Sequence, residues 1–359
     1  MKALFAACGL LLVALCGCSR QSETPVVAIR HVADPSPFLS QTDCFAPWPT
    51  YDAWMDRIKA RNAWWKPKIL LLPFLFPRED FERGQQQLDC SAITYESDGL
   101  TIYGWMAVPK GKPGSKFPVL IYNRGGNGSF GALEFPLLLS KVFPYAENGF
   151  LVLASQYRGM PETDPERFGT DHFGGDDVRD VTRLIELARR LPDADPHEIF
   201  MLGASRGGMM TFMAARRTRD IKAVAVISGV SDLESELQFR PEMEQVYRER
   251  IPGYPADKAR VLAERSVLAW AQDLPADMPV LLLHGDKDER VSPANGTRLH
   301  QRLDQLQRPN KLIVYPGDDH FLSHHKKEAV EEVVRWFRAA MAKDAAVVSP
   351  DGASHQGTR

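Results

Sequence analysis

The sequence has no strong excess of charge of either sign. Its 359 residues contain 44 lysines and arginines against 46 aspartates and glutamates, which leaves a formal net charge of -2. A chain with such a balance generates no dominant field that would attract phosphate groups. We therefore expect no nucleic acid among the partners of this protein.

Long apolar runs and internal repeats are also missing. The run "KILLLPFLFP" at residues 68–77 is interrupted by prolines and is shorter than the roughly 17–25 residues that a membrane-spanning helix needs. No repeated array of short strands, of the kind that builds a propeller, is visible along the chain. These absences favour a globular body over a membrane-spanning or repeat architecture.

Cysteines are few, and three of the five lie in the first twenty residues. This stretch has an early lysine followed by an apolar segment over 3–16, which is typical of a secretory signal. The sequence "LCGC" that ends at Cys18 resembles the lipobox of bacterial lipoproteins, although Cys16 departs from the usual residue at its position. The resemblance implies a signal peptide over 1–17 and a lipid on Cys18. It also implies a cell-envelope protein, with Ser19 favouring the outer membrane facing the periplasm.

Two cysteines, Cys44 and Cys90, remain after such processing. In an oxidising compartment they are candidates for a disulfide that would join an N-terminal extension to the start of the core. Two free buried thiols are the alternative, and the sequence does not choose between them.

Composition divides the rest of the chain into four segments. Residues 18–42 are polar and contain proline, as expected of a flexible tether. Residues 43–89 carry several tryptophans and other aromatics, and we expect them to pack on the core. The main domain is predicted over 90–341, and a disordered tail over 342–359.

Within the main domain, strand-like and helix-like segments alternate. It opens with a hairpin whose turn is Asp98-Gly99, because this dipeptide tolerates the positive φ of a tight turn. Apolar runs separated by helical stretches predict a mostly parallel, doubly wound sheet covered on both faces, with an antiparallel hairpin at its start. A possible lid is predicted at residues 232–277. The expected strands of the parallel part are 117–122, 150–155, 198–203, 222–228, 278–285 and 311–316.

The sequence "GASRG" at 203–207 matches the pattern G-x-S-x-G. It follows an apolar strand and precedes a helical segment, which is the setting of a nucleophile elbow that exposes a serine above the sheet. A helix that begins there also directs backbone N–H groups toward a forming oxyanion. Ser205 is therefore the candidate nucleophile, and a plain tight turn is the alternative.

A serine nucleophile needs a histidine base and a carboxylate that orients it. On this fold the acid and then the base follow the serine along the chain. "HGDKDERV" supplies Asp286 and Asp288 after one strand, and "YPGDDHF" supplies His320 after the last strand. Three neighbouring histidines are given other roles: a structural hydrogen bond for His284, and solvated positions for His324 and His325.

Four motifs together resemble the catalytic domain of the prolyl oligopeptidase family, also called the S9 peptidases. They are "GASRGGMM", "HGDKDERV", "YPGDDHF" and the pair "SQYRGM" and "FGGDDVRDV", and the resemblance spans roughly residues 91–340. It implies an α/β-hydrolase fold with the triad Ser205, Asp288 and His320. By this resemblance Asp288 is the acid.

Two departures from the family pattern concern the substrate. In "NRGGNG" at 123–128, Arg124 stands where relatives carry a histidine or tyrosine before the glycine pair. The oxyanion hole is then expected from the backbone N–H groups of Gly125 and Arg206, with Arg124 and Tyr157 as possible substrate contacts. The second departure is length: about seventy residues separate Cys18 from Cys90, too few for the propeller that precedes the large peptidases.

Together these observations predict a serine hydrolase that cleaves an ester or amide bond of a small ester or peptide through an acyl-enzyme. An S9-like serine peptidase is the first hypothesis, and an envelope carboxylesterase or acyl hydrolase is the second. A non-catalytic binding lipoprotein of the envelope is the third. No metal, organic cofactor or obligate protein partner is expected, and membrane contact is expected through the N-terminal lipid only.

Overall fold

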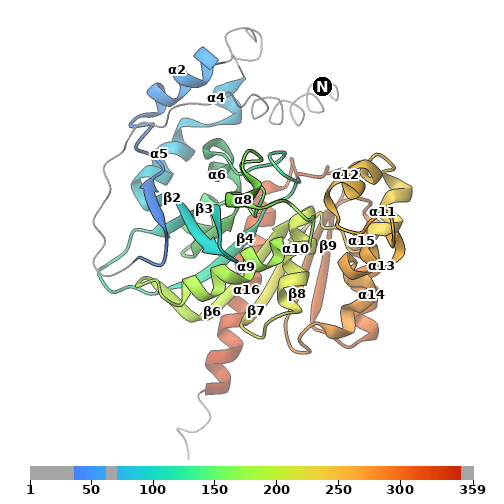
Figure 1. Ribbon diagram of the computed structural model, residues 1–359. Coiled ribbons are helices and arrows are strands. Elements are labelled where there is room, and N and C mark those ends of the chain that lie inside the picture. The colour runs from blue at the N-terminus through green and yellow to red at the C-terminus, as the bar shows by residue number, and fades with distance from the viewer. Residues whose placement is uncertain (1–35, 62–70, 349–359) are drawn as a thin grey trace, which may run out of the picture.

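The computed structural model describes residues 36–61 and 71–348. The predicted signal peptide and the lipidation site Cys18 lie outside these residues. The described chain folds around one nine-stranded sheet with the order β1-β2-β3-β5-β4-β6-β7-β8-β9 (Figure 1). The strands are β1 (Ser40–Asp43), β2 (Leu88–Ser97), β3 (Leu100–Pro109), β4 (Phe117–Asn123), β5 (Leu151–Ser155), β6 (Ala194–Ala204), β7 (Ile221–Ile227), β8 (Val280–Gly285) and β9 (Asn310–Tyr315).

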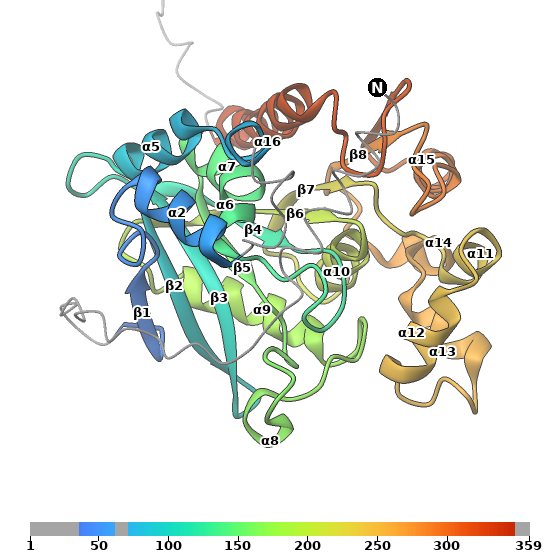
Figure 2. The same ribbon diagram turned by 90° about the horizontal axis from the view of Figure 1, so that it is seen from above.

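Helices cover both faces of this sheet (Figure 2). α9, α10 and α15 contribute to one core cluster, whereas α5, α6, α7 and α16 contribute to the other. The helices are α2 (Tyr51–Arg61), α4 (Leu72–Leu75), α5 (Arg78–Gln87), α6 (Phe135–Lys141), α7 (Phe143–Glu147), α8 (Pro165–Phe168), α9 (Asp177–Ala188), α10 (Arg206–Ala215), α11 (Leu233–Phe239), α12 (Met243–Arg250), α13 (Lys258–Arg265), α14 (Val267–Trp270), the 3-10 helix η2 (Ala271–Asp273), α15 (Ala294–Gln305) and α16 (Lys326–Val348).

The predicted α/β-hydrolase architecture is confirmed. The strands β4 to β9 pair in parallel, whereas β2 and β3 form the antiparallel hairpin. Asp98 and Gly99 adopt φ values of 51° and 77° at its turn, as the dipeptide predicted. Strands buried on both faces need apolar side chains on both faces, and this explains the uninterrupted apolar runs of the sequence.

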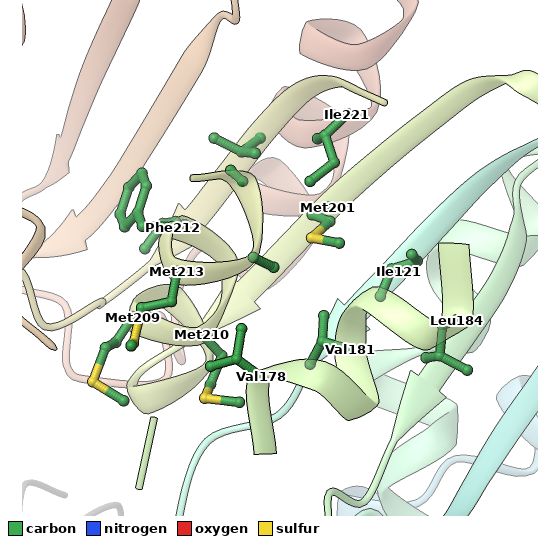
Figure 3. Packing of buried hydrophobic residues seen from close by; sticks show 14 of the residues in the cluster. Ile121, Val178, Val181, Leu184, Met201, Met209, Met210, Phe212, Met213 and Ile221 are labelled. Carbon is green, nitrogen blue, oxygen red and sulfur yellow. The ribbon is translucent and has the colours of Figure 1, made fainter. Parts of the chain in front are cut away.

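The contact between α9 and the sheet shows how the spacing of apolar residues along a helix buries them against the strands. Val178, Val181 and Leu184 lie on one side of α9 and are buried, facing Ile121 of β4 and Met201 of β6 (Figure 3). Residues three or four apart share one side of a helix, so the apolar spacing of α9 becomes a continuous contact with the sheet. The methionines that follow Ser205 in α10 pack in the same cluster.

The N-terminal extension is part of the folded body. β1 pairs antiparallel with β2, and Phe38 is only 7% exposed. The prediction of a tether up to residue 42 is therefore wrong at its end, because the edge of β2 offers free backbone groups that β1 pairs with. Trp54 of α2 stacks on Phe81 of α5 at 5.4 Å between ring centroids.

A disulfide joins Cys44 to Cys90, which is the first of the two alternatives that the sequence left open. It links the start of the extension to β2 over a separation of 46 residues. Closing a loop of this length in the unfolded chain corresponds to about 4 kcal/mol of stabilisation in the chain-entropy model. The bridge thus holds the extension against the hydrolase body.

The last helix extends into the predicted C-terminal tail, and the predicted lid region is helical. α16 continues to Val348, so the prediction of a disordered tail from residue 342 is wrong for its first part, because three of the residues 342–348 are alanines, which favour a helix. Residues 232–277 form the short helices α11 to α14 and η2, which gather on the side of the sheet that ends in β8 and β9 (Figure 1). In the described part of the chain, no helix combines the length and the apolar character needed to cross a bilayer.

Candidate active site

Ser205 lies on a sharp turn between β6 and α10. Its backbone has φ 57° and ψ -125°, a conformation that L-residues rarely adopt. A Cβ added to Gly203 would lie 2.1 Å from the carbonyl oxygen of Gly207, and one added to Gly207 would lie 1.9 Å from that of Asn123. Only glycine fits at both positions, so the spacing in "GASRG" follows directly from the geometry of the turn.

His320 and Asp288 meet above the carboxyl ends of the parallel strands. His320 Nδ1 lies 2.8 Å from Asp288 Oδ2, while the other oxygen of this carboxylate accepts the backbone N–H groups of Arg290 and Val291 at 2.8 and 2.9 Å. A carboxylate acceptor places the imidazole proton on Nδ1 and leaves Nε2 free to accept a proton. Ser205 and His320 line the same cavity.

The choice between the two aspartates of "HGDKDERV" is clear in the structure. Asp286 accepts the N–H of Gly317 at 2.7 Å, and its side chain is 39% exposed. Asp288 has no exposed side-chain surface and pairs with His320. The carboxylate next to the histidine is therefore the one that the family resemblance indicated.

His284 also contacts this carboxylate. Its Nε2 lies 3.1 Å from Asp288 Oδ2 and 3.2 Å from the carbonyl oxygen of Val291, and the residue is only 2% exposed. Both neighbours are acceptors, so Nε2 carries the proton and donates it. The structural hydrogen bond expected of His284 thus orients Asp288, which no sequence signal specified.

Of the other two histidines, His324 is exposed, as the sequence predicted, whereas His325 is partly buried. His324 Nδ1 lies 3.2 Å from Asp318 Oδ1, and His325 Nδ1 lies 2.8 Å from Asp318 Oδ2. Both residues precede α16. The buried carboxylate of Asp318 accepts hydrogen bonds from them, and these bonds close the turn after His320. Neither belongs to the Ser205 cavity.

Burial and hydrogen bonding set the charge states of the pair. Burial opposes ionisation of Asp288, but the hydrogen bonds from His284 and His320 outweigh it and hold the pKa of this carboxyl below its usual value. Burial lowers the pKa of His320, and the charge of Asp288 offsets only part of this effect. At neutral pH the pair is thus a carboxylate and a neutral imidazole.

Both predicted oxyanion donors border the serine. A Cβ added to Gly125 would lie 3.0 Å from Ser205 Cβ and 3.6 Å from its Oγ, so the backbone of Gly125 runs directly beside the nucleophile. α10 begins at Arg206, whose N–H is among those that have no partner within a helix. This arrangement is suited to holding a negatively charged oxygen between the two N–H groups.

Of the two residues proposed to contact the substrate, only Arg124 lines the cavity. Tyr157 is fully buried and donates its hydroxyl to the carbonyl oxygen of Arg124 at 2.9 Å, so the prediction that it touches substrate is wrong. Arg124 lines the cavity, but its guanidinium donates at 2.7 Å to the carbonyls of Gly128 and Gln156. It holds the loop of Gly125 in place, since three carbonyls of this loop and one from the strand end converge on it.

Arg206 and Arg158, which belong to the remaining motifs, each pair with at least one buried carboxylate. The guanidinium of Arg206 contacts Asp171 at 2.6 Å and also Asp177. Arg158 contacts Asp180 and Asp98, each at 2.8 Å. These pairs join the loop after β5 to α9 and α10, so Arg158 and Arg206 have structural roles.

The cavity beside Ser205 has a volume of about 360 Å³. Its walls come from the loop after β4, from α6 and from the segment between His320 and the first turns of α16. Most of the wall is apolar. Four cationic side chains line it, Arg124, Lys141, Arg290 and Lys326, while no aspartate or glutamate of the described residues does. Sequence reasoning missed Lys141 and Lys326 because neither belongs to a motif, and it gave no role to Arg290, although Arg290 lies within "HGDKDERV".

Comparisons with known proteins agree with this geometry. Residues 138–344 match the sequence profile of the prolyl oligopeptidase family. The chain is 28% identical over 261 residues to the uncharacterized peptidase YtmA of Bacillus subtilis, covering 72% of this chain and 96% of that protein. It is 24% identical to dipeptidyl-peptidase 5 of Porphyromonas gingivalis, covering 63% of this chain but only 34% of that enzyme.

The fold itself recurs in solved structures. A puromycin-hydrolyzing peptidase of Mycobacterium tuberculosis superposes with a TM-score of 0.58 and 22% identity, over 68% of this chain and 39% of that one. The acylaminoacyl peptidase of Pyrococcus horikoshii superposes with a TM-score of 0.56 and 20% identity, over 71% of this chain and 41% of that one. This chain therefore spans less than half the length of either.

Proposed function

The chain belongs to the prolyl oligopeptidase family of serine peptidases, and on this premise we propose that it hydrolyses peptide bonds of short peptides with Ser205, Asp288 and His320 as its triad. The observation that carries the proposal is the 2.8 Å contact between His320 Nδ1 and Asp288 Oδ2, made beside a serine held on a strained elbow. A strained serine conformation is stable only when the surrounding structure enforces it, and such strain is common at reactive sites.

The geometry supports the following sequence of steps. His320 Nε2 accepts the proton of Ser205 as Oγ attacks the carbonyl carbon, and the N–H groups of Gly125 and Arg206 stabilise the resulting oxyanion. His320 then donates this proton to the leaving amine, and the C–N bond breaks to give an acyl-enzyme. Water, activated by the same histidine, attacks the acyl-enzyme and releases Ser205. Asp288 remains ionised throughout and stabilises the imidazolium.

A substrate panel tests the peptidase assignment. The protein should hydrolyse aminoacyl or peptidyl nitroanilides with a kcat/KM well above that of an enzyme lacking Ser205, with p-nitrophenyl acetate as a reporter of the nucleophile alone. Turnover of the ester with no measurable turnover of any peptide or anilide would replace the peptidase by the esterase alternative. No turnover of either class would contradict both.

The pH profile should reveal the lowered pKa of His320. The base acts only when neutral, and the neutral form persists above its pKa, so kcat/KM falls as pH falls through that pKa. Because burial shifts the pKa below the ordinary 6.5, we expect an acid limb with a midpoint below 6.5 for a neutral substrate. The measurement is kcat/KM between about pH 4.5 and 8.5. A midpoint at 7 or above would contradict the buried, neutral imidazole.

We further propose that the protein is exported and anchored in the cell envelope by a lipid on Cys18, where it would act on substrates in the periplasm. The support is the lipobox-like sequence that ends at Cys18 and the placement of both other cysteines of the mature chain in one disulfide, which suits an oxidising compartment. Mass spectrometry of the membrane fraction should find an acylated N-terminal Cys18. An unmodified N-terminus at another residue would contradict the anchor.

A further inference from the structure

The cavity beside Ser205 extends to a lysine at the end of α6. Lys141 is the last residue of this helix, is half-buried and lines the cavity. Its Nζ lies 5.6 Å from the centroid of the Phe321 ring, which in turn lies 5.2 Å from the His320 ring. Lys326, at the start of α16, lines the same wall. A cation thus stands one aromatic ring away from the candidate base.

None of the described carboxylates serves as a counter-ion for Lys141. Among the described residues, no aspartate or glutamate oxygen lies within 4.0 Å of its ammonium group, and no hydrogen bond from Nζ is formed. The cavity lining around it contains apolar side chains such as Leu137, Tyr145 and Val330, but no carboxylate. A half-buried ammonium without a partner is costly, and an anionic ligand would remove that cost.

The charges around Lys141 also favour an anionic ligand. Burial, together with the charge of the neighbouring Lys326, lowers the pKa of Lys141 to about 8, although the charge of Asp319 opposes the shift. The other ionisable groups that line the cavity are Arg124, Arg290, the neutral His320, Tyr122 and Tyr145, and none of them is a carboxylate. The ammonium is therefore charged at neutral pH, and the wall around it is positive. A free amino group would be repelled from this cavity, whereas a carboxylate would be attracted.

Proton transfer indicates which part of a substrate occupies the cavity. His320 gives its proton to the leaving amine, so the leaving group must lie on the side of His320. The segment from His320 to Leu322 and the first residue of α16 form one wall of the cavity, and Lys141 faces the same space. The leaving peptide, rather than the acyl portion, is thus the part that can reach Lys141.

We propose, on the basis of the proposed peptidase function, that this cavity receives the leaving peptide and that Lys141 binds its free C-terminal carboxylate. The enzyme then cleaves short peptides close to their C-terminus. The apolar wall provides contacts for the side chains of the departing residues, and the ammonium fixes the chain end by a charge-assisted hydrogen bond. Extended proteins, whose chain continues beyond this point, are excluded as good substrates.

A matched pair of peptides tests the proposal. The two peptides share one scissile bond and end in a carboxylate or in a carboxamide at the same residue. The native enzyme should prefer the acid by about 10-fold or more in kcat/KM, expressed mainly in KM, since a charge-assisted hydrogen bond is lost in the amide. In Lys141→Met the ratio should fall to about 1, whereas Lys141→Arg should keep a preference for the acid.

Lys327→Met is the matched control, because Lys327 is exposed on α16 and does not line the cavity. It should retain the full preference for the acid. A second arm raises the pH: the preference of the native enzyme should decline above about pH 8 as Lys141 loses its proton. This arm needs no variant, so it stands even if Lys141→Met fails to fold.

The outcomes separate the two proposals. Equal kcat/KM for the acid and the amide in the native enzyme, or an undiminished preference in a folded Lys141→Met variant, would overturn the role of Lys141 while leaving the peptidase intact. Failure to cleave either peptide, together with no reaction of Ser205 with an active-site probe, would instead overturn the proposed function.

Discussion

Replacing Ser205 with alanine is expected to lower kcat/KM by about 10⁴-fold or more, which is the effect of removing the nucleophile of a serine triad. Alanine has no Oγ, so no acyl-enzyme can form, and only the oxyanion hole and substrate binding remain to assist water. The fold should survive, because the side chain of Ser205 is small and faces the cavity. The comparison is steady-state kinetics of the two proteins on one nitroanilide.

Ser115→Ala provides the matched control. Ser115 lies in the turn before β4 and does not line the cavity, so its loss should leave kcat/KM within about 2-fold, as is usual for surface substitutions. Retention of more than a few per cent of the native activity in Ser205→Ala would show that another group carries the reaction.

Asp288→Asn should be nearly as damaging, with a loss in kcat of about 10⁴-fold, since the carboxylate selects the tautomer of the histidine. In the native protein Asp288 holds the proton of His320 on Nδ1. An asparagine can present its amide N–H instead, which would reverse the tautomer and place the proton on the nitrogen that must accept it from Ser205. The variant also loses the charge that stabilises the imidazolium.

Asp286→Asn is the control for this prediction, because it makes the same change two residues away. Asp286 is partly exposed, accepts the backbone N–H of Gly317 and lies 4.0 Å from the ammonium of Lys287, so its replacement should leave kcat within about 3-fold. Circular dichroism of both variants verifies that they remain folded. Equal losses in the two variants would contradict the assignment of Asp288 as the acid.

The sequence predicted the parallel sheet and the elbow well, because both depend on local signals. Strands covered on two faces must be apolar throughout, and a serine on a tight turn requires Gly203 and Gly207. The choice of Asp288 over Asp286 needed the family resemblance, since both aspartates follow the same strand. Only the structure shows that the Asp288 side chain is the one turned toward His320.

What the sequence could not supply depends on contacts between distant segments. Tyr157 precedes Arg158 in the motif "SQYRGM", yet its side chain is buried in the core, where its hydroxyl donates to the carbonyl oxygen of Arg124. Lys141 belongs to no motif, and it matters only because α6 ends beside the His320 loop. The pairing of β1 with β2 likewise joins residues more than forty positions apart, beyond any local pattern.

The most direct test of the central claim is to locate the reactive serine chemically. The native protein is treated with a fluorophosphonate, digested, and analysed by mass spectrometry. The account predicts one adduct, on the peptide that contains Ser205, with labelling much reduced in Asp288→Asn because the serine is no longer activated. An adduct on a different residue, or labelling that persists unchanged in Ser205→Ala, would contradict it.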